Sequence, residues 1–293
     1  MAATRCLCWC ALWLAGCALR ARAPSPTAPS LTTYEAHAGA ELSAQFAIAV
    51  EQPASTATVA PPVYASSSTR RCAEFLVDAS AQKTKRCWCK PGHTQAWASL
   101  WFAGAPVVVT VRNSEGWGNW SEVVLRPRRA NISLRKINDT ALSFTLPPSA
   151  LGYKLSLESA GQIDPLPGCD GFPPIVGDSL MIFADPESLA PDPGPAAATT
   201  SASPGALYFG PGHHDLQGQM VLPPSVSSVY IAGGAWVSGG FISESDTARV
   251  AISGRGVLSG SLQTFLQGPA GSAPCQYNGS YCWSLVNLDK GSR

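Results

Sequence analysis

The sequence predicts an all-β protein in which an antiparallel β-sandwich is followed by a parallel β-solenoid. The composition, with 25 Pro, 27 Gly and only 13% charged residues, favours short strands and many turns over long helices. In the first half of the chain, short runs alternate between apolar and polar residues, as half-buried strands do. In the second half, a glycine-rich phrase recurs at a fixed spacing, which is typical of stacked coils of strands.

Residues 1–23 have the pattern of a secretory signal peptide. Arg5 supplies the positive charge, Cys6–Leu19 the apolar stretch, and Ala21–Ala23 a small-residue cleavage site. A rival interpretation is a bacterial lipobox at Leu14–Cys17, which would place a lipid anchor on Cys17. The apolar stretch is too short to cross a bilayer comfortably, and no other segment is a transmembrane candidate. We therefore expect a secreted protein or, with a lipid on Cys17, one held at the cell surface.

Residues 34–185 are expected to form the sandwich. Six runs alternate with period two and are separated by turn residues: AQFAIAV, APVVVTVR, SEVVLRP, ALSFTLP, YKLSLES and SLMIFA. Short strands with short connections are typical of an antiparallel β-sandwich. The next segment, residues 186–205, is rich in Pro, Ala, Ser and Thr and cannot build a core. It is expected to be a linker or a long surface loop.

Residues 206–293 contain the repeat and are expected to begin the solenoid. GGAWVSGGF, which starts at Gly233, is answered 21 positions later by GRGVLSGSL, and PGHHDLQGQMV precedes it at the same spacing. Apolar residues that share a slot should form inward ladders, with glycines at sharp bends. The expected ladders are Val229/Val250, Ile231/Ile252, Leu216/Val237/Leu258 and Met220/Phe241/Leu262. A pair of glycine-rich hairpins of similar composition is the alternative.

Because an exported chain meets an oxidising compartment, its cysteines are candidate disulfide partners. Four of the ten lie in the signal region, which leaves Cys72, Cys87, Cys89, Cys169, Cys275 and Cys282. Cys275 and Cys282 flank a turn-rich loop and are the best candidate pair. For the C-x-C at Cys87 and Cys89, disulfides to Cys72 and Cys169 are favoured over a metal or redox site, because no Cys/His pair matches it at zinc spacing.

Surface modification and charge complete the evidence from composition. Four N-x-[ST] sequons are glycosylation candidates if the host modifies its secreted proteins: Asn119, Asn131, Asn138 and Asn278. The 20 basic and 19 acidic residues give a net charge of +1. The chain therefore lacks the basic character of a nucleic-acid-binding protein.

The residues of the repeat also resemble those of glycoside hydrolase family 49, the dextranases and isopullulanase. The resemblance rests on LMIFADPE, YFGPGHHDL, VLPPSVSSVYIAGGAWVSGGF and VAISGRGVLSG, and less specifically on YEAHAGAELSAQFAIAVEQ and APVVVTVR. It covers about residues 34–260, which correspond to the N-terminal part of the family's fold. This resemblance implies an N-terminal β-sandwich followed by a right-handed parallel β-helix of the pectin-lyase-like superfamily.

The family resemblance implies inverting hydrolysis of glycosidic bonds in an α-glucan or a related polysaccharide, without a metal or organic cofactor. Inversion requires one carboxylic acid to protonate the leaving oxygen and a carboxylate to activate water. Enzymes of the family carry these acids on coils after the GRGVLSG turn, whereas residues 206–293 contain only the dispersed Asp215, Glu244, Asp246 and Asp289. No catalytic residue can be assigned to this chain. We therefore expect a truncated β-helix without hydrolytic activity of its own.

Two other groups of residues have a functional and a structural interpretation. His213-His214-Asp215 has the residue types of a metal or acid–base cluster, but no third ligand at a suitable spacing, so a structural role is favoured. Trp117 and Trp120, in the loop EGWGNWSE, could stack on sugar rings or pack across strands. A second function therefore stays open, that of a non-catalytic secreted carbohydrate-binding or wall-associated β-protein.

Overall fold

The computed structural model describes residues 28–67, 94–117, 123–159, 179–185, 205–243, 249–260 and 286–287. In these residues the secondary structure is a series of strands and one 3-10 helix, η3 (Arg128–Ala130), without an α-helix. The strands form four sheets. The prediction of an all-β protein is confirmed. No helix among the described residues has the length and apolar character needed to cross a membrane.

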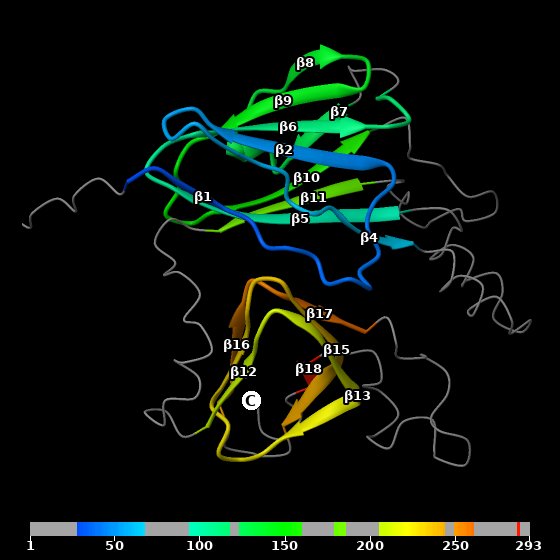
Figure 1. The fold of residues 1–293 in the computed structure, drawn as a ribbon, viewed down its shortest axis with the longest axis vertical. Coiled ribbons are helices and arrows are strands. Elements are labelled where there is room, and N and C mark those ends of the chain that lie inside the picture. Colours follow the sequence, from blue (N-terminus) through cyan, green and yellow to red (C-terminus); the bar gives the residue numbers. More distant parts are fainter. Residues whose placement is uncertain are drawn as a thin grey trace, which may run out of the picture.

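Two of the four sheets face each other and form the sandwich in the upper part of Figure 1. The first sheet has the order β1-β5-β11-β10-β7, and β4 also pairs with β5. Its strands are β1 (Ser30–Thr32), β4 (Tyr64–Ser67), β5 (Thr94–Ala103), β7 (Val123–Arg126), β10 (Tyr153–Ser159) and β11 (Ser179–Asp185). The second sheet has the order β3-β2-β6-β9-β8. Its strands are β2 (Phe46–Gln52), β3 (Ala57–Val59), β6 (Val107–Asn113), β8 (Arg135–Asn138) and β9 (Ala141–Leu146).

The core of the sandwich comes from the alternation seen in the sequence. Along β2, Phe46, Ile48 and Val50 are buried while the residues between them are more exposed. Val109 of β6 and Leu180 of β11 are fully buried and belong to the same apolar cluster. Successive side chains of a strand point to opposite faces, so β2 contributes every second residue to the space between the sheets.

One strand pair departs from the predicted antiparallel arrangement. β5 and β11 run parallel, with Gln95 opposite Ser179 and Trp101 opposite Asp185. The other pairs of described strands in the sandwich are antiparallel. Alternation within a strand reports which face is buried, but it does not report the direction of a partner strand far away in the chain. The prediction of an antiparallel sandwich is therefore wrong at this pair.

A buried amide joins the two sheets of the sandwich. Gln52, at the end of β2, is fully buried. Its Nε2 donates to the backbone oxygens of Ala103 at 2.9 Å and Ala105 at 3.1 Å. Its Oε1 accepts a hydrogen bond from the Ser55 hydroxyl at 3.0 Å. Since every polar atom of the amide has a partner, its burial does not carry the cost of an unsatisfied group.

The other two sheets are parallel and lie in the lower part of Figure 1. One consists of β12 (Ala206–Phe209), β14 (Ser228–Ile231) and β16 (Ala251–Gly254). The other consists of β13 (Gly212–Leu222), β15 (Ala235–Ser243) and β17 (Val257–Ser259), with β18 (Val286–Asn287) also paired to β15. Both sheets contribute to one apolar cluster. Parallel pairing throughout these strands contradicts the alternative of two glycine-rich hairpins, whose strands would be antiparallel.

The spacing of 21 residues is right for part of this arrangement. Val237 lies opposite Leu258, and Met220 lies opposite Phe241, as the repeat predicts. Leu216 is not opposite Val237, because His214 takes that position. A bulge between Asp215 and Gln219 shifts the register along β13, so the predicted ladder holds only after the bulge. Leu262 lies outside the described residues.

The predicted ladders of the other parallel sheet are wrong by two residues. Val229 lies opposite Ile252 rather than Val250, and Ile231 lies opposite Gly254 rather than Ile252. Ile231 is paired with Gly254, and across the corner Trp236 is paired with Val257. The corner thus runs from Ile231 to Trp236 on one turn and from Gly254 to Val257 on the next. The corner is therefore shorter on the second of these turns. Aligning the glycines conceals this difference in corner length.

Candidate functional site

The sandwich meets the parallel sheets at a contact region that we call the junction. On the sandwich side, the junction consists of Tyr34, His37, Tyr64, Trp97 and Asp185; on the other side it consists of His213, Gly233, Trp236 and Arg255. In Figure 1, β4 and β5 are the sandwich strands that lie nearest the parallel sheets. Sequence reasoning singled out His213 and Gly233 among these residues, but for other roles.

Trp236 is the central side chain of the aromatic part of the junction. Ala235 and Val237 point into the parallel core, and alternation along β15 therefore directs Trp236 to the outside, where it is half-buried. Its ring centroid lies 5.5 Å from that of Tyr64, 6.3 Å from that of Trp97 and 5.2 Å from that of His37. Ring pairs at these separations contribute attraction beyond the burial of their area. Burial also raises the pKa of Tyr64.

A buried ion pair forms the second part of the junction. Arg255 follows β16, and its Nε donates to Oδ2 of Asp185 at the end of β11, at 2.7 Å. The Arg255 side chain is 4% exposed and that of Asp185 is 26% exposed. Burial alone would lower the pKa of Arg255, but Tyr34, Asp185 and Tyr230 around it raise that pKa above its ordinary value. The guanidinium is therefore charged at any physiological pH.

A glycine of the repeat makes room for the third contact. A Cβ atom added to Gly233 would lie 2.2 Å from two ring atoms of Tyr34. The Tyr34 ring thus occupies the space that a side chain at this corner would fill. The glycine that sequence reasoning attributed to a bend of the repeat also admits the segment before β2.

The residues of the His213-His214-Asp215 motif have separate partners. His213 Nε2 lies 2.9 Å from the Ser238 hydroxyl, while His214 Nε2 lies 2.7 Å from the backbone oxygen of Gly210. Asp215 Oδ1 accepts a hydrogen bond from the Gln217 backbone N–H at 2.7 Å. The described residues contain no group of three or more His, Cys, Asp or Glu placed to hold a metal ion. The His213–Ser238 pair is closed to substrates, because Ser238 is 2% exposed.

Trp117 lies in the sandwich core and is 4% exposed. Its ring centroid is 5.9 Å from that of Phe46, at a tilt of 40°. A ring enclosed in this way has no face available to a sugar, so the position of Trp117 beside Phe46 in the core does not fit the sugar-stacking interpretation. Trp120 lies outside the described residues. The composition of the loop alone did not distinguish the two interpretations, since the glycines that flank Trp117 are compatible with a buried ring and with an exposed one.

Of the four glycosylation candidates, Asn131 and Asn138 are exposed, and Asn119 and Asn278 lie outside the described residues. Asn131 follows η3 in the left-handed conformation, with φ of 50°. Asn138 Oδ1 accepts hydrogen bonds from the backbone N–H and hydroxyl of Thr140. The signal peptide, residues 186–204 of the linker and the six disulfide candidates also lie outside the described residues.

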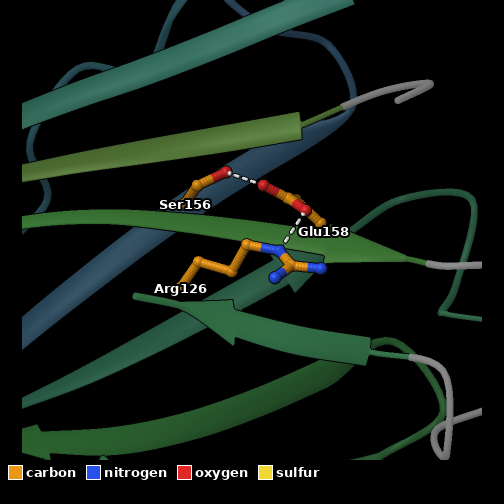
Figure 2. A network of polar contacts seen from close by, with 3 residues as sticks. All are labelled: Arg126, Ser156 and Glu158. Carbon is orange, nitrogen blue, oxygen red and sulfur yellow. Dashed lines mark hydrogen bonds and ion pairs between the residues drawn. The ribbon is translucent and has the colours of Figure 1, made fainter. Parts of the chain in front are cut away.

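A polar network on the sandwich was missed at the level of sequence. Arg126 Nε donates to Glu158 Oε2 at 2.8 Å, and the Ser156 hydroxyl donates to Glu158 Oε1 at 2.9 Å (Figure 2). Arg126 lies opposite Ser156 on the neighbouring strand, which places it diagonally to Glu158. Cross-strand charge pairs of this kind stabilise a sheet modestly, and sequence patterns gave no register from which to find this one.

Carboxylates are sparse in the parallel sheets. In residues 205–243, 249–260 and 286–287, Asp215 is the one acidic residue. Glu244, Asp246 and Asp289 lie outside the described residues. The described part of these sheets thus has no pair of carboxylates that could act as the acid and base of glycoside hydrolysis.

An all-β chain with an N-terminal sandwich in contact with parallel sheets is the fold class that these observations define. Residues 43–187 match the glycosyl hydrolase family 49 N-terminal Ig-like domain. The resemblance of this chain to the N-terminal part of family 49 proteins is therefore confirmed.

Similar proteins extend this finding. The isopullulanase of Aspergillus niger is 32% identical over 191 residues, which cover 60% of this chain and 33% of the relative. A dextranase of Arthrobacter globiformis is 29% identical over 205 residues, which cover 58% of this chain and 32% of the relative. The chain thus spans about a third of the length of the curated relatives it matches. Dex49A from Penicillium minioluteum has a similar fold, with a TM-score of 0.54 and 19% identity over 78% of this chain and 48% of that one.

Proposed function

We propose that this chain is the N-terminal portion of a secreted glycoside hydrolase that cleaves glycosidic bonds of an α-glucan with inversion. The observation that carries the proposal is the match of residues 43–187 to the family 49 N-terminal domain. The isopullulanase and dextranase relatives indicate an α-glucan as the substrate class. The N-terminal apolar stretch supports secretion.

The proposal assigns the parallel sheets to the first coils of a right-handed β-helix, with the sandwich at residues 34–185 and the helix from residue 206. Support comes from the order of the chain, which alternates between the two sheets from β12 to β17 and adds a parallel partner at each return. The likeness to the Dex49A fold supports it as well. The junction would then hold the first coils against the sandwich.

Hydrolysis with inversion needs one carboxylic acid to protonate the leaving oxygen and another carboxylate, on the opposite face of the sugar, to activate water. Asp215 alone cannot supply both groups, and its carboxylate accepts a hydrogen bond from the Gln217 backbone N–H. We therefore propose that the 293-residue chain positions the start of the β-helix and does not hydrolyse glucans by itself.

The test compares the protein from its native source with the 293-residue chain produced alone. The native protein should release reducing sugars from dextran or pullulan. The first product seen by proton NMR should be the β-anomer, because inversion at an α-linked carbon yields it. Absence of reducing sugars from both glucans would contradict the hydrolase proposal, and an α-anomer as first product would contradict inversion. Hydrolytic activity of the 293-residue chain alone would contradict the proposal that this chain does not hydrolyse glucans by itself.

The alternative of a non-catalytic carbohydrate-binding protein has less support than before. It relied on Trp117 and Trp120 as stacking surfaces, and Trp117 is buried. Affinity electrophoresis of the 293-residue chain in gels that contain dextran would test this alternative. Retarded migration, together with no bond cleavage by the native protein, is the combination that favours this alternative.

A further inference from the structure

Two imidazole rings from distant segments are stacked at the junction. His37 lies between β1 and β2, and His213 lies on β13. Their ring centroids are 5.1 Å apart and their planes differ by 14°. The His37 ring also contacts Trp236 at a centroid distance of 5.2 Å. The pair therefore lies where the segment before β2 meets the sheet of β13, β15 and β17.

A hydrogen bond from Gly39 occupies the nitrogen of His37 that a second proton would need. The Gly39 backbone N–H donates to His37 Nδ1 at 3.1 Å, so this nitrogen is an acceptor and the ring carries its proton on Nε2. Nε2 is buried and has no hydrogen-bond partner among the described residues. A second proton on His37 must therefore go to Nδ1, where it would break the hydrogen bond from Gly39.

The environment offers little to stabilise a second proton. The other titratable groups on the elements packed against the pair are Tyr34, Glu35 and Glu41 on the segment of His37, Tyr64 on β4, and His214 and Asp215 on β13. Within the described part of the chain, no hydrogen bond or ion pair joins Glu35, Glu41 or Asp215 to either stacked ring. Burial, and then the charge of His213, lower the pKa of His37. The Trp236 ring offers a weak attraction to a cation, which opposes these two effects.

We propose that the His37–His213 stack is a pH-sensitive latch that holds the segment before β2 against the parallel sheet at neutral pH and releases it in acid. Protonation of both rings would place like charges 5.1 Å apart and remove the Gly39 hydrogen bond. The unfolded ring has the ordinary pKa of 6.5, and the folded ring has a lower one. The stabilisation is therefore complete above pH 6.5 and is lost as the pH falls through this value towards the lower pKa of the folded ring.

An NMR titration of the folded wild-type chain tests the premise. The sequence contains four histidines, so single substitutions can assign each imidazole signal. We expect the pKa of His37 to lie below 6.5 and to rise in His213→Gln, because the charge of the neighbouring ring is then absent. A His37 pKa at or above the ordinary value, or one that does not respond to His213→Gln, would overturn the proposal.

Hydrogen exchange then tests release of the latch. Protection of the segment around His37, corrected for the intrinsic pH dependence of exchange, is compared at about pH 7.5 and about pH 5 in wild type, His37→Gln and His214→Gln. His214 is a matched control on the same strand, because its ring bonds Gly210 and packs against Phe209. Wild type and His214→Gln should lose protection in acid, by about tenfold for each unit by which the His37 pKa is lowered. Equal acid losses in His37→Gln and wild type, or no loss in wild type, would overturn the latch.

Discussion

Asp185→Asn is the substitution that most directly measures how strongly the junction stabilises the fold. Asn keeps the shape of the side chain but removes its charge, and the guanidinium of Arg255, 4% exposed, stays buried after the carboxylate of Asp185 is lost. Removing one partner of a buried ion pair costs about 3–5 kcal/mol. Because Asp185 is 26% exposed, water can partly replace the lost charge, and we expect a cost at the lower end of that range.

Thermal unfolding followed by circular dichroism is the assay. A loss of 1 kcal/mol lowers Tm by about 2–4 °C in a protein of this size, so Asp185→Asn should lower Tm by roughly 6–12 °C. Glu158→Gln is the matched control, because Arg126 Nε binds Glu158 at a similar 2.8 Å but the Arg126 side chain is 52% exposed. Exposed pairs contribute about 0.2–1 kcal/mol, which corresponds to a Tm loss of at most about 4 °C. Equal losses in the two variants would refute the argument that burial makes the junction pair important.

Three further substitutions test other parts of the structure. Gly254→Ala should cost about 3 kcal/mol or more in urea unfolding, because φ is +133° and the new Cβ would lie 1.9 Å from the Ile231 oxygen; a neutral result would contradict the close approach of these turns. Trp117→Ala should cost about 3–5 kcal/mol without changing migration in dextran gels, and altered migration at unchanged stability would restore its sugar-binding role. Gln52→Leu should cost about 1–3 kcal/mol, because the buried backbone oxygens of Ala103 and Ala105 each lose one hydrogen bond; an unchanged urea midpoint would contradict the stabilising role of the Gln52 amide.

Six strands of the sandwich, β2, β6, β7, β9, β10 and β11, were predictable because alternation is a local property. In AQFAIAV, the residues Phe46, Ile48 and Val50 are the buried ones, as period two requires. The direction of pairing was not predictable from the same signal. β5 and β11 run parallel, and the residues that bring them together are distributed over the whole sandwich core.

The repeat predicted parallel stacking but only part of its register. Glycines dominate the alignment of the three phrases, and they mark corners whose lengths differ between turns. The structure instead aligns backbone hydrogen bonds, which place Gly254 opposite Ile231. Gly254 adopts φ of +133°, a conformation that a side chain would strain. The glycine was correctly recognised as structural, while its partner was wrong by two residues.

The junction could not be read from the sequence, because its contacts join residues that share no local pattern. Asp185 and Arg255 are 70 positions apart, and each appears in the sequence as an isolated charge. Tyr34 and Gly233 meet only because a missing side chain leaves space for a ring. His213 was noticed for its neighbours His214 and Asp215, whereas the structure pairs it with His37. Contacts of this kind depend on the relative position of the two parts of the fold.

The buried amide of Gln52 has a consequence for the fidelity of folding. Apolar side chains tolerate small displacements of one sheet over the other, since dispersion and burial depend weakly on which methyl groups meet. The amide does not, because its hydrogen bonds reach the backbone oxygens of Ala103, at the end of β5 in the facing sheet, and of Ala105, in the connection to β6. A sandwich assembled one step out of alignment would enclose an unsatisfied amide and deprive both carbonyls of this donor, although Ala103 would keep its hydrogen bond from the Ala105 N–H. One glutamine thereby helps the chain to distinguish its native arrangement from near copies that bury almost the same apolar surface.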